Sequence, residues 1–313
     1  MKKLLILGDL QSPEVQSIMK ICRDLEHHVF VLNTSDAAQL NLLHFDVTSN
    51  ALFLDQVEKL CDFDAVYWQQ VTPIKFGLCA TPNLITYCND ESAYIDHIQR
   101  EYASLIQILL SEYRIAWFNG WHALQFYRAK PRQLTLAQSL GANIPPTLIT
   151  SNPSTAHSFI ESQQNVVVKP VLGGATTFTL SKEYKQLEAI QKWCTQPVTL
   201  QSFVLGKDIR TYVIGDEDFS FIIHKQTETF QSVGKTKNHV IDVEPINLPS
   251  SIKQLAQRLM RAFHMRWTAI DWRLTPKGNF VFIAADPIPR FVENEKLTNI
   301  PISEKLSLLL SST

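Results

Sequence analysis

Two aspartates toward the end of the chain are spaced so that both could reach one metal ion. Asp271 lies inside an apolar run, Ala269–Leu274, and Asp286 directly follows a second run, Phe280–Ala285. The turn-forming residues 275–279 between the runs predict a β-hairpin. Cross-strand neighbours lie roughly 5 Å apart, and Mg²⁺ usually takes one or two carboxylates together with substrate phosphates. The alternative is a hairpin whose acids only cap a turn.

Lys169 interrupts the otherwise apolar run Val166–Pro170 of the strand predicted for Asn165–Pro170. A lysine at such a position is costly unless it meets an anion or reaches water. Gly173 and Gly174 follow closely, and a glycine turn lets backbone N–H groups approach a phosphate beside a lysine. The alternative is an edge-strand lysine that faces solvent, followed by an ordinary hairpin turn.

Two other phosphate-binding motifs are excluded by their spacing. Gly234-Lys235-Thr236 resembles the end of a P-loop, but Thr229 occupies the position of the required first glycine. The turn at residues 8–12 lacks the second and third glycines of a dinucleotide fingerprint. The nine histidines show no HxxxH spacing and no Ser-His-Asp context, so the sequence does not support metalloprotease or catalytic-triad chemistry.

The composition is that of a globular protein with more than one core. The chain has 313 residues, of which 45% are hydrophobic and 19% charged. A formal net charge of −1 gives no reason to expect nucleic acid or a membrane surface as a partner. The five cysteines are odd in number and form no CxxC pair, which favours reduced thiols and a cytoplasmic location.

The first part of the chain alternates between strand and helix signals. Such a βαβ rhythm predicts a small parallel sheet with helices on its faces, which we assign to a domain of residues 1–119. The expected elements are strands Lys3–Gly8, His28–Leu32, Ala65–Trp68 and Ile115–Asn119, and helices from Ser12-Pro13-Glu14, over Leu52–Leu60 and over Ser92–Tyr113.

The rest of the chain is dominated by short strands separated by turns, which predicts antiparallel sheet. We divide it into a central lobe, residues 120–198, and a C-terminal lobe, residues 199–313. The fold class is therefore α/β plus α+β. The expected strands are Asn165–Pro170, Thr176–Leu180, Val198–Val204, Ile209–Ile214, Phe219–His224, Phe230–Val233 and the two of the hairpin, and the expected helices are Pro131–Leu140, Ser251–His264 and Ser303–Leu310.

The order of these motifs resembles the ATP-grasp superfamily over most of the chain. Lys130 comes first, followed by VVVKPVLGG, then LQSFVLGKDIRTYVIGD, then AIDWR and PKGNFVFIAADP. The resemblance is closest to the microviridin (graspetide) peptide macrocyclases, with the RimK-like carboxylate–amine ligases as more distant relatives. It implies an ATP-grasp fold, in which a small N-terminal α/β domain precedes two antiparallel α+β lobes.

The resemblance also implies a site for ATP and Mg²⁺ between the two lobes. Lys130 and Lys169 would contact phosphates, together with the turn at Gly173 and Gly174. Asp271 would bind the metal. The remaining implied roles are an adenine hinge at Gln201, Ser202, Phe203 and Val204, a ribose contact from Asp208, and phosphate or acyl-phosphate contacts from Arg210 and Arg273.

This chain departs from the family pattern at two places. The second strand of the hairpin usually ends in a Glu-x-Asn metal pair, which here reads Ala284-Ala285-Asp286. One carboxylate is lost and another gained in a different position. In addition, the Arg-Arg pair that often follows the tryptophan of the N-terminal domain is Gln69-Gln70 here, after Trp68, which predicts a weaker subsite for an acidic peptide.

Three functions are compatible with these residues. The first is an ATP-dependent ligase that activates a carboxylate as an acyl-phosphate and joins it to an amine or hydroxyl of a ribosomal precursor peptide. The second applies the same chemistry to free amino acids or other small carboxylates. The third is a nucleotide-binding protein without ligase activity, which is suggested by Ala284 in place of the usual metal-binding Glu. The resemblance also leaves a homodimer open.

Overall fold

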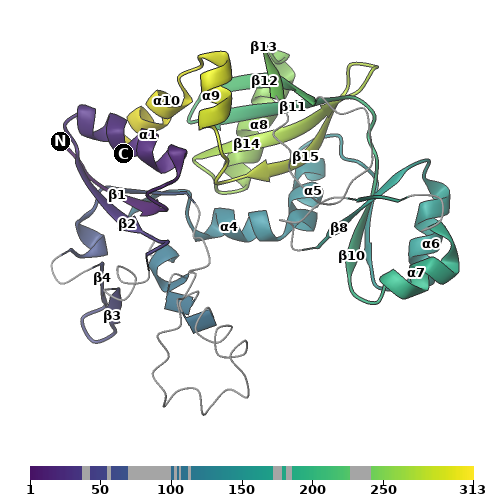
Figure 1. Cartoon of the computed structure of the whole chain (residues 1–313), viewed down its shortest axis with the longest axis horizontal. Coiled ribbons are helices and arrows are strands. Elements are labelled where there is room, and N and C mark those ends of the chain that lie inside the picture. The colour runs from purple at the N-terminus through teal and green to yellow at the C-terminus, as the bar shows by residue number, and fades with distance from the viewer. Residues whose placement is uncertain are drawn as a thin grey trace. The chain divides into compact units, whose positions relative to one another are not determined.

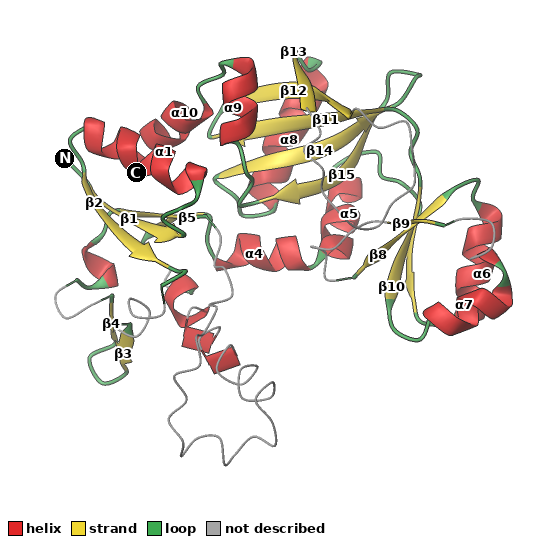
Figure 2. Cartoon of the chain, viewed as in Figure 1, coloured by secondary structure: helices red, strands yellow, loops and turns green. Residues whose placement is uncertain are grey.

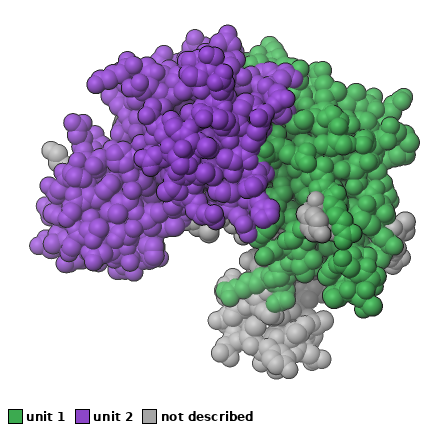
Figure 3. Space-filling view, turned by 180° about the vertical axis from the view of Figure 1, so that it is seen from behind, with its two compact units in different colours: residues 1–121, 265–267, 288–313 green, residues 122–264, 268–287 purple. Residues whose placement is uncertain are grey.

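The computed structural model describes every residue except 37–42, 55–57, 70–99, 102–103, 106, 112–113, 172–177, 181–184 and 226–240. The chain forms two compact units, shown in green and purple in Figure 3. Unit 1 comprises residues 1–121, 265–267 and 288–313, and unit 2 comprises residues 122–264 and 268–287.

Unit 1 is built around the predicted parallel sheet. The strands lie in the order β2-β1-β5-β6, and all the pairings are parallel. The apolar side chains of β1 and β5, such as Leu5 and Val66, are buried. The strands are β1 (Lys3–Gly8), β2 (His28–Asn33), β5 (Ala65–Trp68) and β6 (Ala116–Phe118), and the first helix is α1 (Pro13–Asp24).

The helix predicted over Leu52–Leu60 is wrong. β3 (His44–Asp46) and β4 (Ala51–Phe53) form an antiparallel pair there, followed by the short 3₁₀ turn η1 (Leu60–Asp62). The carboxylate of Asp46 accepts hydrogen bonds from the backbone N–H groups of Thr48 and Ser49, at 2.9 and 3.4 Å. Such an Asx turn closes the hairpin locally and competes with a helix. The helix predicted over Ser92–Tyr113 lies mostly outside the described residues.

Two helices at the end of the chain, α9 (Val292–Thr298) and α10 (Ile302–Ser311), belong to unit 1. The α10 helix packs against α1, where the Ser17 hydroxyl donates to Ser303 Oγ at 2.8 Å (Figure 1). The short segment 265–267 is also held in unit 1, because Asn119 bonds to its backbone. The three-domain division drawn from the sequence stays a prediction.

Unit 2 contains two sheets, and the smaller carries the strand with Lys169. Its order is β7-β10-β8-β9, and each pairing is antiparallel. Helices α6 and α7 pack together, and Ile160, Ile190 and Leu200 form part of the core beneath them (Figure 2). The elements are β7 (Thr147–Thr150), α6 (Pro153–Ser162), β8 (Val166–Pro170), β9 (Phe178–Thr179), α7 (Leu187–Trp193) and β10 (Val198–Ser202).

The larger sheet of unit 2 has the order β13-β12-β11-β14-β15 and contains the predicted hairpin. The antiparallel pair β14–β15 has a register shift between Asp271 and Trp272. The elements are β11 (Lys207–Ile214), β12 (Glu217–Lys225), β13 (Ile241–Ile246), α8 (Ser250–Ala262), β14 (Trp267–Leu274) and β15 (Phe280–Asp286), and two helices, α4 (Trp121–Arg128) and α5 (Lys130–Ser139), precede the smaller sheet.

The predicted fold class is confirmed by these three main sheets, one parallel and two with antiparallel pairings. The strand predicted at Phe230–Val233 lies outside the described residues. Among the residues that the structure describes, no helix is long and apolar enough to cross a membrane.

Candidate functional site

The candidate site residues that the structure describes all lie in unit 2. All except Phe203 and Val204, which follow β10, sit in a helix or strand, which fixes their backbone. Lys130 begins α5, Lys169 is near the end of β8, Gln201 and Ser202 end β10, Asp208 and Arg210 are on β11, Asp271 and Arg273 are on β14, and Asp286 ends β15. Gly173 and Gly174 lie outside the described residues.

Asp271 and Asp286 are on the same face of the hairpin. The register places Asp271 opposite Ala284, and Asp286 is two residues further along β15. Side chains two apart on a strand share a face, so the two carboxylates are diagonal neighbours across the strand pair. The hairpin therefore brings the two acids together as predicted.

Arg210 forms a two-pronged ion pair with Asp271. Its Nε donates to Oδ1 at 2.8 Å and its Nη2 to Oδ2 at 3.0 Å. Burial alone would lower the pKa of this guanidinium, but the carboxylate of Asp271 outweighs it and raises the pKa above its ordinary value. Arg210 is thus permanently charged and already anchored to the predicted metal ligand.

Lys130, at the start of helix α5, lies within the electrostatic influence of the same two acids. Burial lowers the pKa of its ammonium group, and the charges of Asp286 and Asp271 oppose that effect. Its Nζ lies 4.7 Å from the centre of the Tyr127 ring. Burial, then Asp286 and Asp271, raises the pKa of the Tyr127 hydroxyl. No feature of the sequence singles out Tyr127, because a tyrosine in an amphipathic helix has no distinctive spacing.

The Lys169 ammonium is hydrogen-bonded to Gln201, a residue of the predicted adenine hinge. Its Nζ donates to Oε1 of Gln201 at 2.6 Å, and Gln201 Nε2 donates to Thr147 Oγ1 at 3.0 Å. Gln201 is only 4% exposed. Burial, followed by repulsion from Lys130 and Arg273, lowers the pKa of Lys169 to about 8. A lowered pKa from neighbouring cations is typical of a site prepared for an anion.

Arg273 and Asp208 form a second ion pair, with Nη1 and Oδ1 3.0 Å apart. The guanidinium lies 5.3 Å from the centre of the Phe203 ring, and Nη1 also donates to the Gly206 carbonyl at 3.0 Å. Gly206 has a φ of 152°, and a Cβ there would overlap the carbonyl of Leu274. The segment after β10 is therefore fixed against β14.

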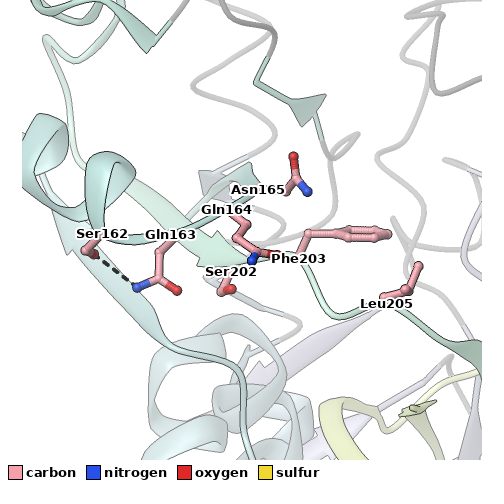
Figure 4. A pocket seen from close by; sticks show the side chains of 7 residues that line it. All are labelled: Ser162, Gln163, Gln164, Asn165, Ser202, Phe203 and Leu205. Carbon is pink, nitrogen blue, oxygen red and sulfur yellow. Dashed lines mark hydrogen bonds between the residues drawn. The ribbon is translucent and has the colours of Figure 1, made fainter. Parts of the chain in front are cut away.

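A cavity of about 380 Å³ lies beside this segment, as Figure 4 shows. Its lining comes from residues 162–165, before β8, from Ser202 at the end of β10, and from Phe203 and Leu205 after it. Ser202 and Phe203 belong to the predicted adenine hinge. The remaining lining is polar except for Leu205, and Gln163 Nε2 donates to Ser162 Oγ at 3.0 Å.

The charges around the two acids suit a polyphosphate with a divalent cation. Four cationic side chains, Lys130, Lys169, Arg210 and Arg273, accompany Asp208, Asp271 and Asp286. Within the described parts of the chain, no group of three or more His, Cys, Asp or Glu side chains could hold a metal alone. Two carboxylates on one face still fit Mg²⁺, which commonly completes its shell with water and phosphate oxygens.

A second cavity, about 550 Å³, lies within unit 1 at the carboxyl ends of β1 and β5. Gln69 lines it and is 4% exposed. Its Nε2 donates to the carbonyls of Ile288 and Pro289, at 3.3 Å each, and its Oε1 accepts from the Tyr67 hydroxyl. The amide is thus committed to holding the segment after β15. Gln70 lies outside the described residues.

Comparison with known proteins supports the resemblance. Residues 134–232 match the family model of the prokaryotic glutathione synthetase ATP-grasp domain. No curated protein matches the chain. Among solved structures, the ATP-grasp ligase PsnB in complex with a minimal precursor is 21% identical with a TM-score of 0.83, covering 100% of this chain and 98% of PsnB.

Two further structures agree over the full length. The macrocyclase MdnC from Microcystis aeruginosa MRC, bound to its precursor peptide MdnA, is 18% identical with a TM-score of 0.80, covering 99% of this chain and 100% of MdnC. A RiPP-associated ATP-grasp ligase from Chryseobacterium gregarium, in complex with ADP and a leader and core peptide, is 20% identical with a TM-score of 0.79. The match covers 100% of this chain and 97% of that ligase. The chain therefore has the ATP-grasp fold, as the sequence indicated.

Proposed function

We propose that this protein is an ATP-dependent ligase that activates a carboxylate as an acyl-phosphate and joins it to an amine or hydroxyl of a peptide. The observation that carries the proposal is the cluster of four cations around two carboxylates on the β14–β15 hairpin. The structural relatives named above are peptide-modifying ATP-grasp ligases, which supports a peptide as the substrate.

The nucleotide would bind against the segment that follows β10. Backbone groups of residues 201–204 would contact the adenine edge. The Asp208 carboxylate would accept a hydrogen bond from a ribose hydroxyl once its ion pair with Arg273 is broken. The cavity of about 380 Å³ is beside this segment. Gln201 has a second role in this proposal, because its side chain accepts a hydrogen bond from the Lys169 ammonium and orients it.

Phosphoryl transfer needs charge neutralisation and alignment rather than a protein nucleophile. Lys130 and Lys169 would hold phosphate oxygens, assisted by the turn predicted at Gly173 and Gly174. Mg²⁺, held by Asp271 and Asp286, would neutralise charge that builds up on the phosphates. Arg210 and Arg273 would bind the oxygens of the acyl-phosphate and keep its carbonyl open to the attacking amine or hydroxyl.

The cavity of unit 1 is our candidate subsite for a part of the substrate. It is lined by side chains of both charges, Asp9, Glu293, Arg290 and Lys296 among them. Crevices at the carboxyl ends of parallel strands commonly bind ligands. Because Gln69 stands where the family pattern often has a cation, we expect a weaker preference for an acidic side chain at this position.

The test is ADP release and product mass with a precursor peptide encoded beside this gene. A peptide product lighter by one water, formed with one ADP per bond, supports the proposal. Equal turnover of free amino acids, indifferent to a leader sequence, would instead favour a small-carboxylate ligase. Nucleotide binding without Mg²⁺ dependence or turnover would favour a binding protein, a candidate that Ala284 motivates.

The RimK-like relationship, the cytoplasmic location and a homodimer stay predictions. A single sedimentation velocity experiment on the purified protein tests the last of these. A monomer at concentrations well above those used for turnover would remove the dimer from consideration.

A further inference from the structure

Gln133 makes an unusual pair of contacts with the strand that carries Asp286. It lies on α5, is 1% exposed, and bonds through both ends of its amide to one residue, Ala285. Its Oε1 accepts from the Ala285 N–H at 3.0 Å, and its Nε2 donates to the Ala285 carbonyl at 2.9 Å. A buried amide is costly unless it is hydrogen-bonded, and here both of its ends are.

The two hydrogen bonds from Gln133 pair backbone groups of Ala285 that a neighbouring strand would otherwise pair. Among the described strands, β15 is the outermost of its sheet, so the backbone groups on its outer edge face no further strand of that sheet. Ala285 turns its N–H and carbonyl to that edge, whereas its neighbours Ala284 and Asp286 turn theirs toward β14. Further along the same edge, the Asn143 carbonyl accepts from Phe282 N at 2.8 Å. Gln133 therefore fixes the edge at the residue between Ala284 and Asp286.

The same helix turn carries Lys130, three residues before Gln133, and residues three apart lie on one side of a helix. The backbone of Asp286 is also held from β14, where Thr268 Oγ1 donates to its carbonyl at 2.8 Å. Gln133 is thus the direct link between the element that presents Lys130 and the strand end that presents Asp286. Sequence reasoning missed it because a single glutamine in a helix carries no spacing signal.

We propose that Gln133 is a positioning residue that sets the distance between the Lys130 ammonium and the Asp286 carboxylate, and thereby couples metal binding to nucleotide binding. The inference rests on the proposed function, since it assigns phosphate to Lys130 and Mg²⁺ to Asp286. Gln133 touches neither ligand. It acts through the backbone of Ala285, as supporting residues around metal ligands commonly do.

The experiment measures ADP affinity by titration calorimetry, with and without Mg²⁺. Gln133→Met keeps the length of the side chain and removes both hydrogen bonds. We expect it to reduce the enhancement of ADP affinity by Mg²⁺ about tenfold, while ADP affinity without Mg²⁺ changes less than about threefold. Gln138→Met, an exposed glutamine on the same helix, is the matched control and leaves both quantities unchanged.

A second variant separates positioning from folding. Gln133→Glu still accepts from the Ala285 N–H, but it donates to the Ala285 carbonyl only when its carboxyl group is protonated. Burial raises the pKa of a carboxyl group, so we expect the Mg²⁺ enhancement to recover as the pH falls from about 8 to about 6, relative to the unsubstituted protein at each pH. Hydrogen exchange of residues 280–288 reports the Ala285 amide and should quicken in Gln133→Met.

The outcomes distinguish the two proposals. An unchanged Mg²⁺ enhancement in folded Gln133→Met overturns the positioning role and leaves the proposed function standing. The same result follows if Gln133→Glu shows no recovery at lower pH. Absence of Mg²⁺-dependent nucleotide binding by the unsubstituted protein overturns the proposed function, and this inference with it.

Discussion

Arg210 holds both carboxylate oxygens of Asp271, with Nε–Oδ1 and Nη2–Oδ2 distances of 2.8 and 3.0 Å. The Asp271 side chain is still 36% exposed. An ionised carboxylate offers about four acceptor positions, so two remain for a cation after Arg210 is bound. The pair links the predicted metal ligand to a residue expected to bind the acyl-phosphate.

Substituting Asp271→Asn should raise the Mg²⁺ concentration needed for half-maximal ADP release by about tenfold or more. The amide keeps the size of the side chain but removes the charge that attracts the cation. The measurement is initial rate against Mg²⁺ concentration. Asp216→Asn is the matched control, because Asp216 pairs with Arg261 at 3.0 Å on the exposed surface. An unchanged Mg²⁺ requirement in Asp271→Asn would remove Asp271 from the metal site.

Nucleotide affinity should fall as the pH rises through about 8, because the pKa of Lys169 in the nucleotide-free protein is about 8. Above that pH the amine is neutral and loses its attraction for phosphate. A bound phosphate stabilises the charged form, so binding near pH 8 should take up protons. Calorimetry in buffers of different ionisation enthalpy measures this uptake.

Two variants of Lys169 sharpen the test. Lys169→Ala should abolish nucleotide binding or turnover, whereas Lys169→Arg keeps a charge that does not titrate near pH 8 and should flatten the pH dependence. If Lys169→Ala turns over near the unsubstituted rate, the phosphate assignment is wrong. If Lys169→Arg titrates as before, another group is responsible for the pH effect.

The lowered pKa of Lys169 makes the free energy of unfolding depend on pH. An unfolded lysine titrates near 10.4, so between about pH 8 and pH 10.4 the unfolded chain binds more protons than the folded one. Lys169 therefore contributes a stability that increases with pH across this window, and its burial disfavours folding below it. Lys169→Met should flatten the rise in melting temperature over the same pH range.

Asn119→Ala should destabilise unit 1 by about 2–4 kcal/mol, because it leaves buried backbone groups without partners. Asn119 is fully buried, donates to the Trp267 carbonyl at 2.8 Å, and accepts from Arg266 N at 2.6 Å. The measurement is thermal unfolding by calorimetry. Asn152→Ala, which removes one bond at the exposed start of α6, is expected to cost about 1 kcal/mol. Equal shifts in the two variants would argue against a structural role for Asn119.

Local patterns predicted the strands well and long-range side-chain pairs poorly. The hairpin was predicted because turn residues separate two apolar runs, and its register then places Asp271 and Asp286 on one face. The bond between Lys169 and Gln201 joins residues 32 apart in the chain, and no local signal marks such a pair. The family resemblance implied an adenine contact for Gln201, while its side chain bonds to Lys169 and Thr147.

Asp286→Ala should cost far more activity than a surface substitution, because it leaves Asp271 as the one carboxylate on this face of the described β14–β15 pair. The expected result is at least a tenfold loss of Mg²⁺-dependent turnover, roughly the effect of losing a metal contact. Asp242→Ala, an exposed acid on β13 of the same sheet, is the control. Normal turnover in Asp286→Ala would mean that Asp286 only caps a turn and does not bind the metal.

Ala284→Glu should strengthen Mg²⁺ binding, because Ala284 lies directly opposite Asp271 in the register and is only partly buried. A carboxylate there would be closer to Asp271 than Asp286 is, and added ligand charge increases the affinity of a hard-cation site. We expect the Mg²⁺ requirement to fall several-fold, roughly 1 kcal/mol. Ala284→Gln, of the same shape without the charge, is the control and should leave the requirement unchanged. An equal effect of both substitutions would mean that shape rather than charge matters at residue 284, and that the metal lies elsewhere.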